Sequence, residues 1–268
     1  MAEHKNVVVA VRCRPLNSRE RKRNGSCLVT MQGRQTTIEA PMDIQQRSSS
    51  IHGEQQQQQQ QQQSRERRRT YNFDYSYWSA TDASDPCFAS QETVFADIGR
   101  AVLDHALSGY HCCVFAYGQT GSGKSYTMMG GQGREAGLIP RICQALFAAI
   151  GGGGTAADES FHVEVSYLEI YNERVRDLLN PQQEPGGGGL RVREHPALGP
   201  YVEDLTKAAV STVDQVLAHM SQGNKARTVA ATNMNEASSR SHAVFTIMLT
   251  RRSHNRALDV VSERVARI

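Results

Sequence analysis

Residues 118–125 read G-Q-T-G-S-G-K-S, which is a complete G-x-x-x-x-G-K-[S/T] pattern. The pattern follows an apolar run, Cys112–Ala116, that is typical of a buried strand, and it precedes a stretch that can form a helix. Glycines at these positions let successive backbone N–H groups turn toward phosphate oxygens, which a side chain with a Cβ would obstruct. The sequence therefore predicts a strand–loop–helix unit that binds a nucleoside triphosphate. A glycine-rich turn that only caps a helix is the alternative.

Different groups of this loop are expected to bind different parts of a magnesium–nucleotide complex. Backbone N–H groups surround the phosphates, and Lys124 supplies a mobile cation for the β- and γ-phosphates. The hydroxyl of Ser125 is suited to a Mg²⁺ ion. The expected nucleotide-binding residues are Gly118, Gln119, Thr120, Gly121, Ser122, Gly123, Lys124 and Ser125.

Composition limits the remaining possibilities. A chain of 268 residues can form one large α/β domain, and its net charge of +3 is too small to indicate a nucleic-acid partner. Two basic clusters, 19–23 and 65–69, are interpreted as solvated loops, with contact to an acidic polymer as the alternative. Six cysteines without a C-x-x-C pair indicate a reducing compartment, and the adjacent Cys112 and Cys113 are interpreted as small core residues. Without a signal peptide or an apolar run of bilayer length, we expect a cytosolic protein.

Low-complexity segments interrupt a pattern of alternating strands and helices. Residues 40–69 form a glutamine-rich loop insert, and residues 151–158 and 181–189 form glycine-rich loops. The alternation elsewhere predicts an α/β fold with a parallel or mixed sheet covered by helices on both faces. Strands are expected at 7–11, 27–31, 36–39, 71–75, 112–116, 161–167 and 242–250, and helices from Ser90 onward, at 139–150 and from Val213 onward.

Three longer motifs carry a resemblance to a known family. They are F-A-Y at 115–117, S-Y-L-E-I-Y-N-E at 166–173 and N-E-A-S-S-R-S-H at 235–242. Together they resemble the kinesin motor domain over nearly the whole chain outside the inserts, and residues 71–78, 124–130 and 223–235 look like its kinesin-3 branch. The resemblance implies a P-loop NTPase-type motor head with a central mixed, mostly parallel β-sheet and helices on both faces.

The same resemblance implies roles for single residues. Residues 235–242 look like switch I, the loop that senses the γ-phosphate, with Ser239 joining Ser125 on Mg²⁺ and Ser238 contacting the lytic water. A helix N-cap series is the alternative for this segment. The implied switch I residues are Asn235, Ser238, Ser239, Arg240, Ser241 and His242, and the implied catalytic residues are Lys124, Ser238, Ser239 and Arg240.

Arg14 and Pro15 resemble the family's base-side motif, which packs on one face of adenine, and Tyr126 could stack on the other face. For Arg14 and Pro15, a solvent-facing turn is the alternative. In the segment 190–195, Arg191 and Arg193 would contact acidic tubulin through charge, with a solvated strand as an equal alternative. The resemblance thus implies an ATPase of the plus-end microtubule motor type, located in the cytoplasm and on the cytoskeleton. Its cofactors would be ATP and Mg²⁺, its partner the microtubule, with no nucleic acid and no membrane bound through this segment.

One part of the family pattern is not found. The motif D-L-A-G-S-E is expected soon after residues 261–265, where only S-E-R occurs, so 1–268 resembles the N-terminal part of a motor domain without switch II, the main microtubule-binding helix and the neck linker. On the family's topology the strand at 112–116 would then lack both neighbours. Unpaired buried backbone groups cost about 1–3 kcal/mol each, against a domain stability of about 5–15 kcal/mol. We therefore expect the chain alone neither to fold stably nor to hydrolyse ATP as a motor.

Two other functions are compatible with parts of the sequence. The first is a non-motile fragment that binds nucleotide or microtubules without hydrolysis. The second is a P-loop GTPase, but its guanine-reading N-K-x-D motif has only N-K-A-R at 224–227 as a candidate. Arg227 cannot replace the aspartate that accepts hydrogen bonds from the guanine edge.

Overall fold

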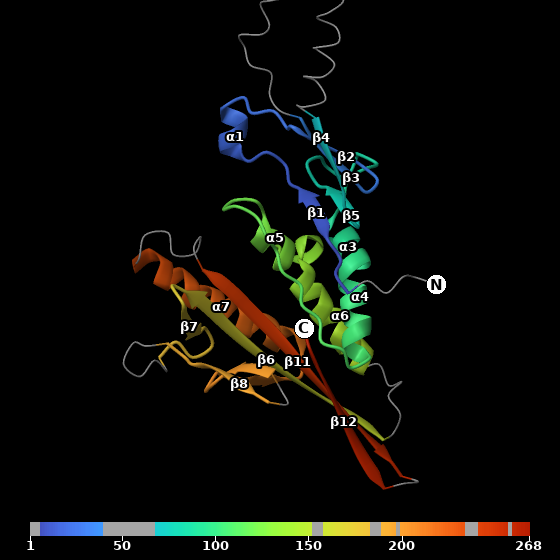
Figure 1. Cartoon of the computed structure of the whole chain (residues 1–268), viewed down its shortest axis with the longest axis vertical. Coiled ribbons are helices and arrows are strands. Elements are labelled where there is room, and N and C mark those ends of the chain that lie inside the picture. Colours follow the sequence, from blue (N-terminus) through green and yellow to red (C-terminus); the bar gives the residue numbers. More distant parts are fainter. Residues whose placement is uncertain are drawn as a thin grey trace, which may run out of the picture. The chain divides into compact units, whose positions relative to one another are not determined.

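The computed structural model describes residues 6–39, 68–151, 158–182, 189–196, 199–233, 241–256 and 259–268 (Figure 1). The glutamine-rich insert expected at 40–69 and the glycine-rich loops expected at 151–158 and 181–189 lie mostly outside these residues. The chain divides into two compact units, residues 1–94 and residues 95–268, and each is described by itself.

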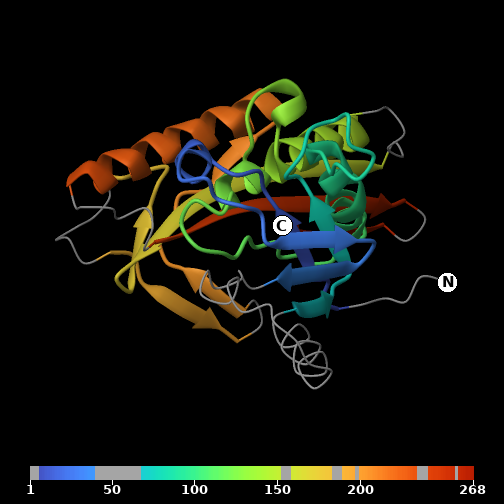
Figure 2. The same cartoon turned by 90° about the horizontal axis from the view of Figure 1, so that it is seen from above.

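The first unit contains two small sheets. β1 (Ala10–Cys13) pairs in parallel with β5 (Tyr75–Trp78). The other sheet is antiparallel, and its strands β2 (Val29–Gln32), β3 (Gln35–Glu39) and β4 (Arg68–Asn72) are visible in Figure 2. Two short helices, α1 (Ser18–Lys22) and α3 (Gln91–Val94), complete the unit. The strands expected at 27–31 and 36–39 are confirmed within two residues.

Asp74 explains why two expected strands have other boundaries. Its side chain accepts a hydrogen bond from the backbone N–H of Val9 at 2.9 Å, and its own N–H donates to the Val9 carbonyl at 3.0 Å. These bonds occupy the backbone of Val9, so the first strand begins at Ala10 rather than at Val7. They also end β4 before Asp74, and the single strand expected at 71–75 is therefore two strands, β4 and β5.

The second unit is built on a five-stranded antiparallel sheet. The strand order is β10 (Ala208–Val210), β6 (Glu159–Tyr171), β11 (His242–Asn255) and β12 (Val260–Arg267). β7 (Arg174–Asp177) pairs with the end of β6 after a two-residue turn in which Asn172 and Glu173 have φ of 48° and 63°. Positive φ at both positions is the geometry of a tight hairpin. A separate hairpin is formed by β8 (Val192–His195) and β9 (Gly199–Val202).

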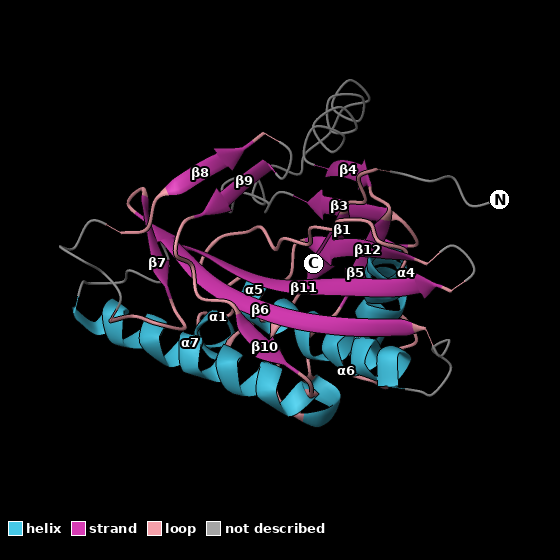
Figure 3. Cartoon of the chain, turned by 90° about the horizontal axis from the view of Figure 1, so that it is seen from below, coloured by secondary structure: helices cyan, strands magenta, loops and turns pink. Residues whose placement is uncertain are grey.

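Helices of the second unit pack on one face of this sheet (Figure 3). They are α4 (Arg100–Leu107), α6 (Leu138–Gly151) and α7 (Val213–Asn233), and the first follows a π-helical turn, η2 (Phe95–Gly99). Leu146 and Val216 bring helical side chains into a core that Val165 and Leu249 enter from neighbouring strands. The expected helices at 139–150 and from Val213 onward are confirmed, as are the strands at 161–167 and 242–250.

The prediction of a buried strand at 112–116 is wrong. These residues form no strand, and Phe115 and Tyr117 are 81% and 95% exposed. Cys113 is exposed as well, so it is not the core residue that its adjacency to Cys112 suggested. The N–H of Cys112 donates to the Arg267 carbonyl at 2.8 Å. Cys112, Val114 and Ala116 are partly buried, and the expectation that the chain alone does not fold stably stays a prediction.

The α/β fold with mixed sheets is confirmed. The expected mostly parallel sheet with helices on both faces is not what the second unit has. Among the described residues the parallel ladder of named strands is β1–β5, the ladders of the second unit are antiparallel, and its helices pack on one face of its sheet. Over the same residues, we find no helix with both the length and the apolar character that a membrane span requires.

Candidate functional site

The loop at 118–125 has the backbone that its glycines were expected to provide. Gly118, Gly121 and Gly123 have φ of 151°, 79° and 97°, a region that residues with a Cβ rarely adopt. A Cβ on Gly118 would lie 2.6 Å from the Oγ of Ser122, whereas the space around Gly121 is open. The loop therefore needs glycine at these positions, and its open side is suited to a phosphate group.

Lys124 lies where this loop meets the helix α5 (Lys124–Met128). Its Nζ donates to the carbonyl oxygens of Gly118 at 2.7 Å and Gln119 at 3.0 Å. The loop thus curves around its own lysine and holds the cation beside the open backbone. The next residue, Ser125, is exposed, which leaves its hydroxyl accessible to a metal ion. An ammonium and a hydroxyl at adjacent positions fit a magnesium–nucleotide complex.

Tyr126 joins the same helix to the segment that follows it. Its hydroxyl donates to the carboxylate of Glu135 in η3 (Gly133–Glu135), while the side chain stays 44% exposed. The ring is therefore anchored at one end and accessible over its surface. Its stacking on adenine stays a prediction.

Arg14 and Pro15 belong to the first unit, at the end of β1. The Arg14 guanidinium donates two hydrogen bonds of 2.8 Å to the Glu20 carboxylate, and Asn17 and Glu20 cap α1 reciprocally. Hydrogen bonding from Arg14, together with the Asn17 backbone N–H, lowers the pKa of Glu20 to about 2. Arg14 is thus held in one orientation, and Pro15 is exposed. Their contact with adenine is a prediction that no observation in the structure tests.

Most of the expected switch I residues lie outside the described residues: Asn235, Ser238, Ser239 and Arg240. Ser241 and His242 are described at the start of β11, where His242 is exposed. The Ser241 hydroxyl accepts a hydrogen bond of 3.0 Å from Nη2 of Arg227 on α7. Nε of Arg227 donates to the buried Glu169 of β6 at 3.0 Å. One guanidinium therefore connects α7, β6 and the start of β11.

The contact between α7 and β6 was not predicted from the sequence. The buried Tyr167 donates its hydroxyl hydrogen to Oδ1 of Asn224 at 2.8 Å, and burial raises the pKa of this hydroxyl. A Cβ on Gly223 would lie 2.2 Å from the Tyr167 ring, so glycine is required for the close approach. Gly223, Asn224 and Arg227 are spaced i, i+1 and i+4, which places them on one side of a helix. That spacing indicates a shared helix face, but it does not identify the strand on which the face packs.

The two arginines expected to contact tubulin differ in their surroundings. Arg191 is exposed and precedes β8, whereas Arg193 lies on β8 and pairs with Glu203, with Nε and Oε2 3.1 Å apart. Both partners of this pair are close to half exposed. The charge of Arg193 is therefore partly compensated.

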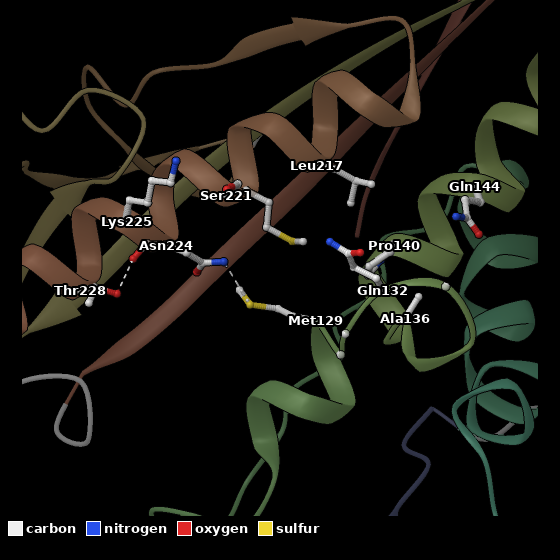
Figure 4. Close-up of a pocket in the computed structure, with 14 residues that line it drawn as sticks. Met129, Gln132, Ala136, Pro140, Gln144, Leu217, Ser221, Asn224, Lys225 and Thr228 are labelled. Carbon is white, nitrogen blue, oxygen red and sulfur yellow. Dashed lines mark hydrogen bonds between the residues drawn. The ribbon is translucent and has the colours of Figure 1, made fainter.

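A pocket of about 890 Å³ lies between α7, α6 and the segment that follows α5 (Figure 4). Asn224 donates through Nδ2 to Sδ of Met129 at 3.3 Å across it, and Thr228 donates to the Asn224 carbonyl at 2.9 Å. No residue of the loop 118–125 lines this pocket, so it is distinct from the candidate nucleotide loop. Over the described part of the chain, no group of three or more His, Cys, Asp or Glu side chains is arranged to hold a metal ion.

Comparisons with known proteins agree with this geometry. A sequence model of the kinesin motor domain matches residues 12–267. The chain is 51% identical over 264 residues to kinesin-like protein KIF1B of Homo sapiens, which covers 98% of this chain and 13% of that protein. It is 49% identical over 265 residues to kinesin-like protein unc-104 of Caenorhabditis elegans, covering 98% and 15%. The chain thus spans a small part of the length of these relatives.

A similar solved structure is that of KIF14 with ADP in complex with a microtubule. It superposes with a TM-score of 0.76 at 39% sequence identity, covering 98% of this chain and 67% of that chain. At this identity and TM-score the likeness shows a shared fold.

Proposed function

The chain belongs to the kinesin motor domain family, in its kinesin-3 branch, and on that premise we propose that it is an ATP-dependent microtubule motor head. It binds Mg-ATP through the loop 118–125 and couples hydrolysis to movement along microtubules. The observation that carries this proposal is the loop itself, in which three glycines with positive φ curve around Lys124.

Lys124 is the residue whose contacts change most in this proposal. Its ammonium exchanges two neutral carbonyl partners, those of Gly118 and Gln119, for anionic oxygens of the β- and γ-phosphates. Hydrogen bonds between charged partners are about twice as strong as neutral ones, so the exchange favours the bound state. The hydroxyls of Ser125 and Ser239 would hold Mg²⁺, which would supply positive charge against the phosphates.

The residues expected from switch I complete the reaction. Ser238 orients the attacking water and Arg240 belongs to the γ-phosphate sensor. Hydrolysis is then phosphoryl transfer to water, catalysed by positioning and charge rather than by a covalent intermediate. Tyr126, with its exposed ring, and Arg14 and Pro15 are the proposed adenine contacts.

Microtubules are the proposed partner, and the cytoplasm and cytoskeleton the proposed location. The KIF14 structure is described as a complex with a microtubule, which supports the same partner for a chain of the same fold. Arg191 and Arg193 are proposed to contact acidic tubulin. Charge contacts between exposed groups weaken with salt, so binding through them should fall steeply as ionic strength rises.

The first test is the affinity of the purified chain for a fluorescent ATP analogue with Mg²⁺. Lys124→Ala should weaken binding by about 10- to 100-fold, because it removes charged hydrogen bonds of about 1.5–3 kcal/mol. Lys207→Ala is the matched control, since Lys207 is an exposed lysine of the same unit that lies before β10. Equal affinities of the two variants would contradict the proposed site.

The second test is ATP turnover with and without microtubules. Stimulated turnover that Lys124→Ala abolishes is the result expected of a motor head. Nucleotide binding without stimulated turnover would support the other hypothesis, a non-motile chain that binds nucleotide or microtubules without hydrolysis.

A further inference from the structure

Tyr126 and Glu135 connect the helix after the candidate nucleotide loop to the next turn of the chain. The Tyr126 hydroxyl donates to the Glu135 carboxylate, a contact between side chains nine residues apart in sequence. Tyr126 lies two positions after Lys124 on α5, so its ring is carried by the short helix that begins at the nucleotide loop. The hydroxyl is the far end of this side chain. A hydrogen bond there fixes the ring at the end opposite its attachment to α5.

Glu135 belongs to a loop, residues 129–137, that is folded back on itself. The N–H of Gly131 donates to the Glu135 carbonyl at 2.7 Å. Gly130 has a φ of 68°, and a Cβ at this position would overlap the Glu135 carbonyl oxygen. Glycine is therefore required where the two sides of the loop pass each other, and the backbone of Glu135 is held at that crossing.

The base of the same loop is attached to α6. The N–H of Gly137 donates to the Met129 carbonyl at 2.9 Å, which closes the loop. Arg141 of α6 donates through Nε to the Ala136 carbonyl at 2.8 Å and through Nη2 to the Arg134 carbonyl at 2.9 Å. These two carbonyls belong to the residues on either side of the acceptor of the tyrosine hydroxyl. The acceptor is therefore fixed to a helix that packs in the core of the second unit.

Both side chains of this contact are accessible to solvent. Tyr126 is 44% exposed, and Glu135 is exposed as well. Substitution of exposed residues generally changes the free energy of unfolding very little, so this bond is not needed for folding. An exposed aromatic side chain without such a bond exchanges between rotamers within nanoseconds. The effect of the bond is therefore to restrict the orientation of the ring.

A ring that is oriented in advance stacks on a base at a lower entropic cost than a free ring. A free side chain loses rotamer freedom when it stacks, and this loss is subtracted from the affinity. The ring of Tyr126 has lost that freedom before a nucleotide binds, because its hydroxyl is already bound to Glu135. The gain in affinity applies only to a triphosphate that carries a base, since the phosphates alone do not stack.

We propose that Glu135 is a positioning residue of the nucleotide site, which holds the ring of Tyr126 in the orientation that stacks on the base. The inference rests on the proposed function, in particular on the predicted contact between Tyr126 and adenine. It assigns to the loop 129–137, which lies outside the phosphate-binding pattern, a role in the affinity for the base. The affinity for the phosphates depends on the loop 118–125 and is independent of Glu135.

The test is isothermal titration calorimetry of the purified full chain with Mg-ATP and, separately, with inorganic triphosphate and Mg²⁺. Glu135→Ala should weaken Mg-ATP binding about 3- to 10-fold, the range expected for ordering one side chain, and leave the affinity for triphosphate unchanged. Tyr126→Ala removes the ring and should weaken Mg-ATP binding about 5- to 100-fold. A general disturbance of the site would change both affinities, so a loss confined to Mg-ATP identifies a role on the base side.

Further variants isolate the hydrogen bond itself. Glu135→Gln keeps an acceptor but removes the charge, so it should bind Mg-ATP like the unmodified sequence. Tyr126→Phe keeps the ring but removes the donor, so its loss of affinity should equal that of Glu135→Ala. The double variant Tyr126→Phe/Glu135→Ala should bind no more weakly than either single variant, because both remove the same bond. Asp104→Ala is the matched control, since it removes an exposed carboxylate of α4 in the same unit.

Three results would overturn the proposal: an unchanged Mg-ATP affinity of Glu135→Ala, equal losses of this variant for Mg-ATP and triphosphate, or additive losses in the double variant. Lys124→Ala separates this proposal from the previous one, because it should weaken the binding of both ligands. If Lys124→Ala weakens both and Glu135→Ala weakens neither, the phosphate site is supported and the positioning role is wrong. If Lys124→Ala changes neither affinity, the proposed nucleotide site is wrong, and the positioning role with it.

Discussion

The ion pair between Glu169 and Arg227 can be used to measure how burial changes the contribution of an ion pair to the free energy of unfolding. Its atoms are 3.0 Å apart, and the side chains of Glu169 and Arg227 are 5% and 20% exposed. The second unit also contains a matched pair, Glu203 and Arg193, at 3.1 Å but with side chains 40% and 47% exposed. The two pairs have almost the same distance and differ in their contact with water.

Loss of the glutamate should therefore lower the free energy of unfolding by very different amounts at the two positions. Removal of one partner from a buried pair costs about 3–5 kcal/mol, because the other charge is left without compensation. The partial exposure of Arg227 favours the lower half of that range for Glu169→Ala. Glu169→Gln keeps an acceptor for the guanidinium and should cost about 1–3 kcal/mol. An exposed pair contributes about 0–1 kcal/mol, so Glu203→Gln should fall within that range.

The assay is urea unfolding followed by far-ultraviolet circular dichroism, with thermal unfolding as a second measurement. One kcal/mol corresponds to about 2–4 °C in Tm for a unit of this size, so Glu169→Ala should lower Tm by at least about 6 °C. The double variant Glu169→Leu/Arg227→Met should recover much of the loss, because it removes both buried charges. Equal small effects of Glu169→Gln and Glu203→Gln would refute the argument.

Three further predictions concern packing, pH and thiol reactivity. Gly223→Ala places a carbon 2.2 Å from the Tyr167 ring and should cost about 1–3 kcal/mol by urea unfolding, whereas Gly151→Ala, with nothing within 4 Å, should change stability by less than about 1 kcal/mol. The pKa of Glu20 is lowered to about 2 from 4.5, so its hydrogen bonds should be intact above about pH 4.5 and lost as pH falls toward 2; a carboxylate NMR titration with a midpoint near 4.5 would contradict this. Burial raises the pKa of Cys143 to about 12, so iodoacetamide at pH 9 should label this thiol only after unfolding, and rapid labelling of the folded chain would show that it is accessible.

The regular elements that the sequence predicted correctly are those with a strong internal pattern. The apolar residues of 139–150 recur at helical spacing, and those of 161–167 alternate, so each segment defines its own buried face. The run at 112–116 is as apolar as either but forms no strand. Apolar composition indicates a preference for burial, whereas a strand also needs a neighbouring backbone to bond with, and that partner is not encoded in the run itself.

The candidate site also has one part that could be predicted from the sequence and another that could not. The loop at 118–125 could be predicted because its residues act together within eight positions. The network of Arg227 could not, because its partners Glu169 and Ser241 meet only through the register of β6 and β11, in which Glu169 lies opposite Ala243. Asp74 is a comparable case, since its bonds to Val9 shift strand boundaries across 65 positions of sequence. Local chemistry can be derived from local sequence, and these tertiary contacts cannot.

The exposed segment before the loop has a practical consequence for work with this protein. Phe115 and Tyr117 present large exposed side chains, and Cys113 adds an accessible thiol. Clustered exposed apolar side chains favour association between chains as concentration rises. Purified material should therefore be kept dilute and reduced, and light scattering across a concentration series should precede any kinetic measurement. Lysine in place of Phe115 should suppress self-association without touching the core.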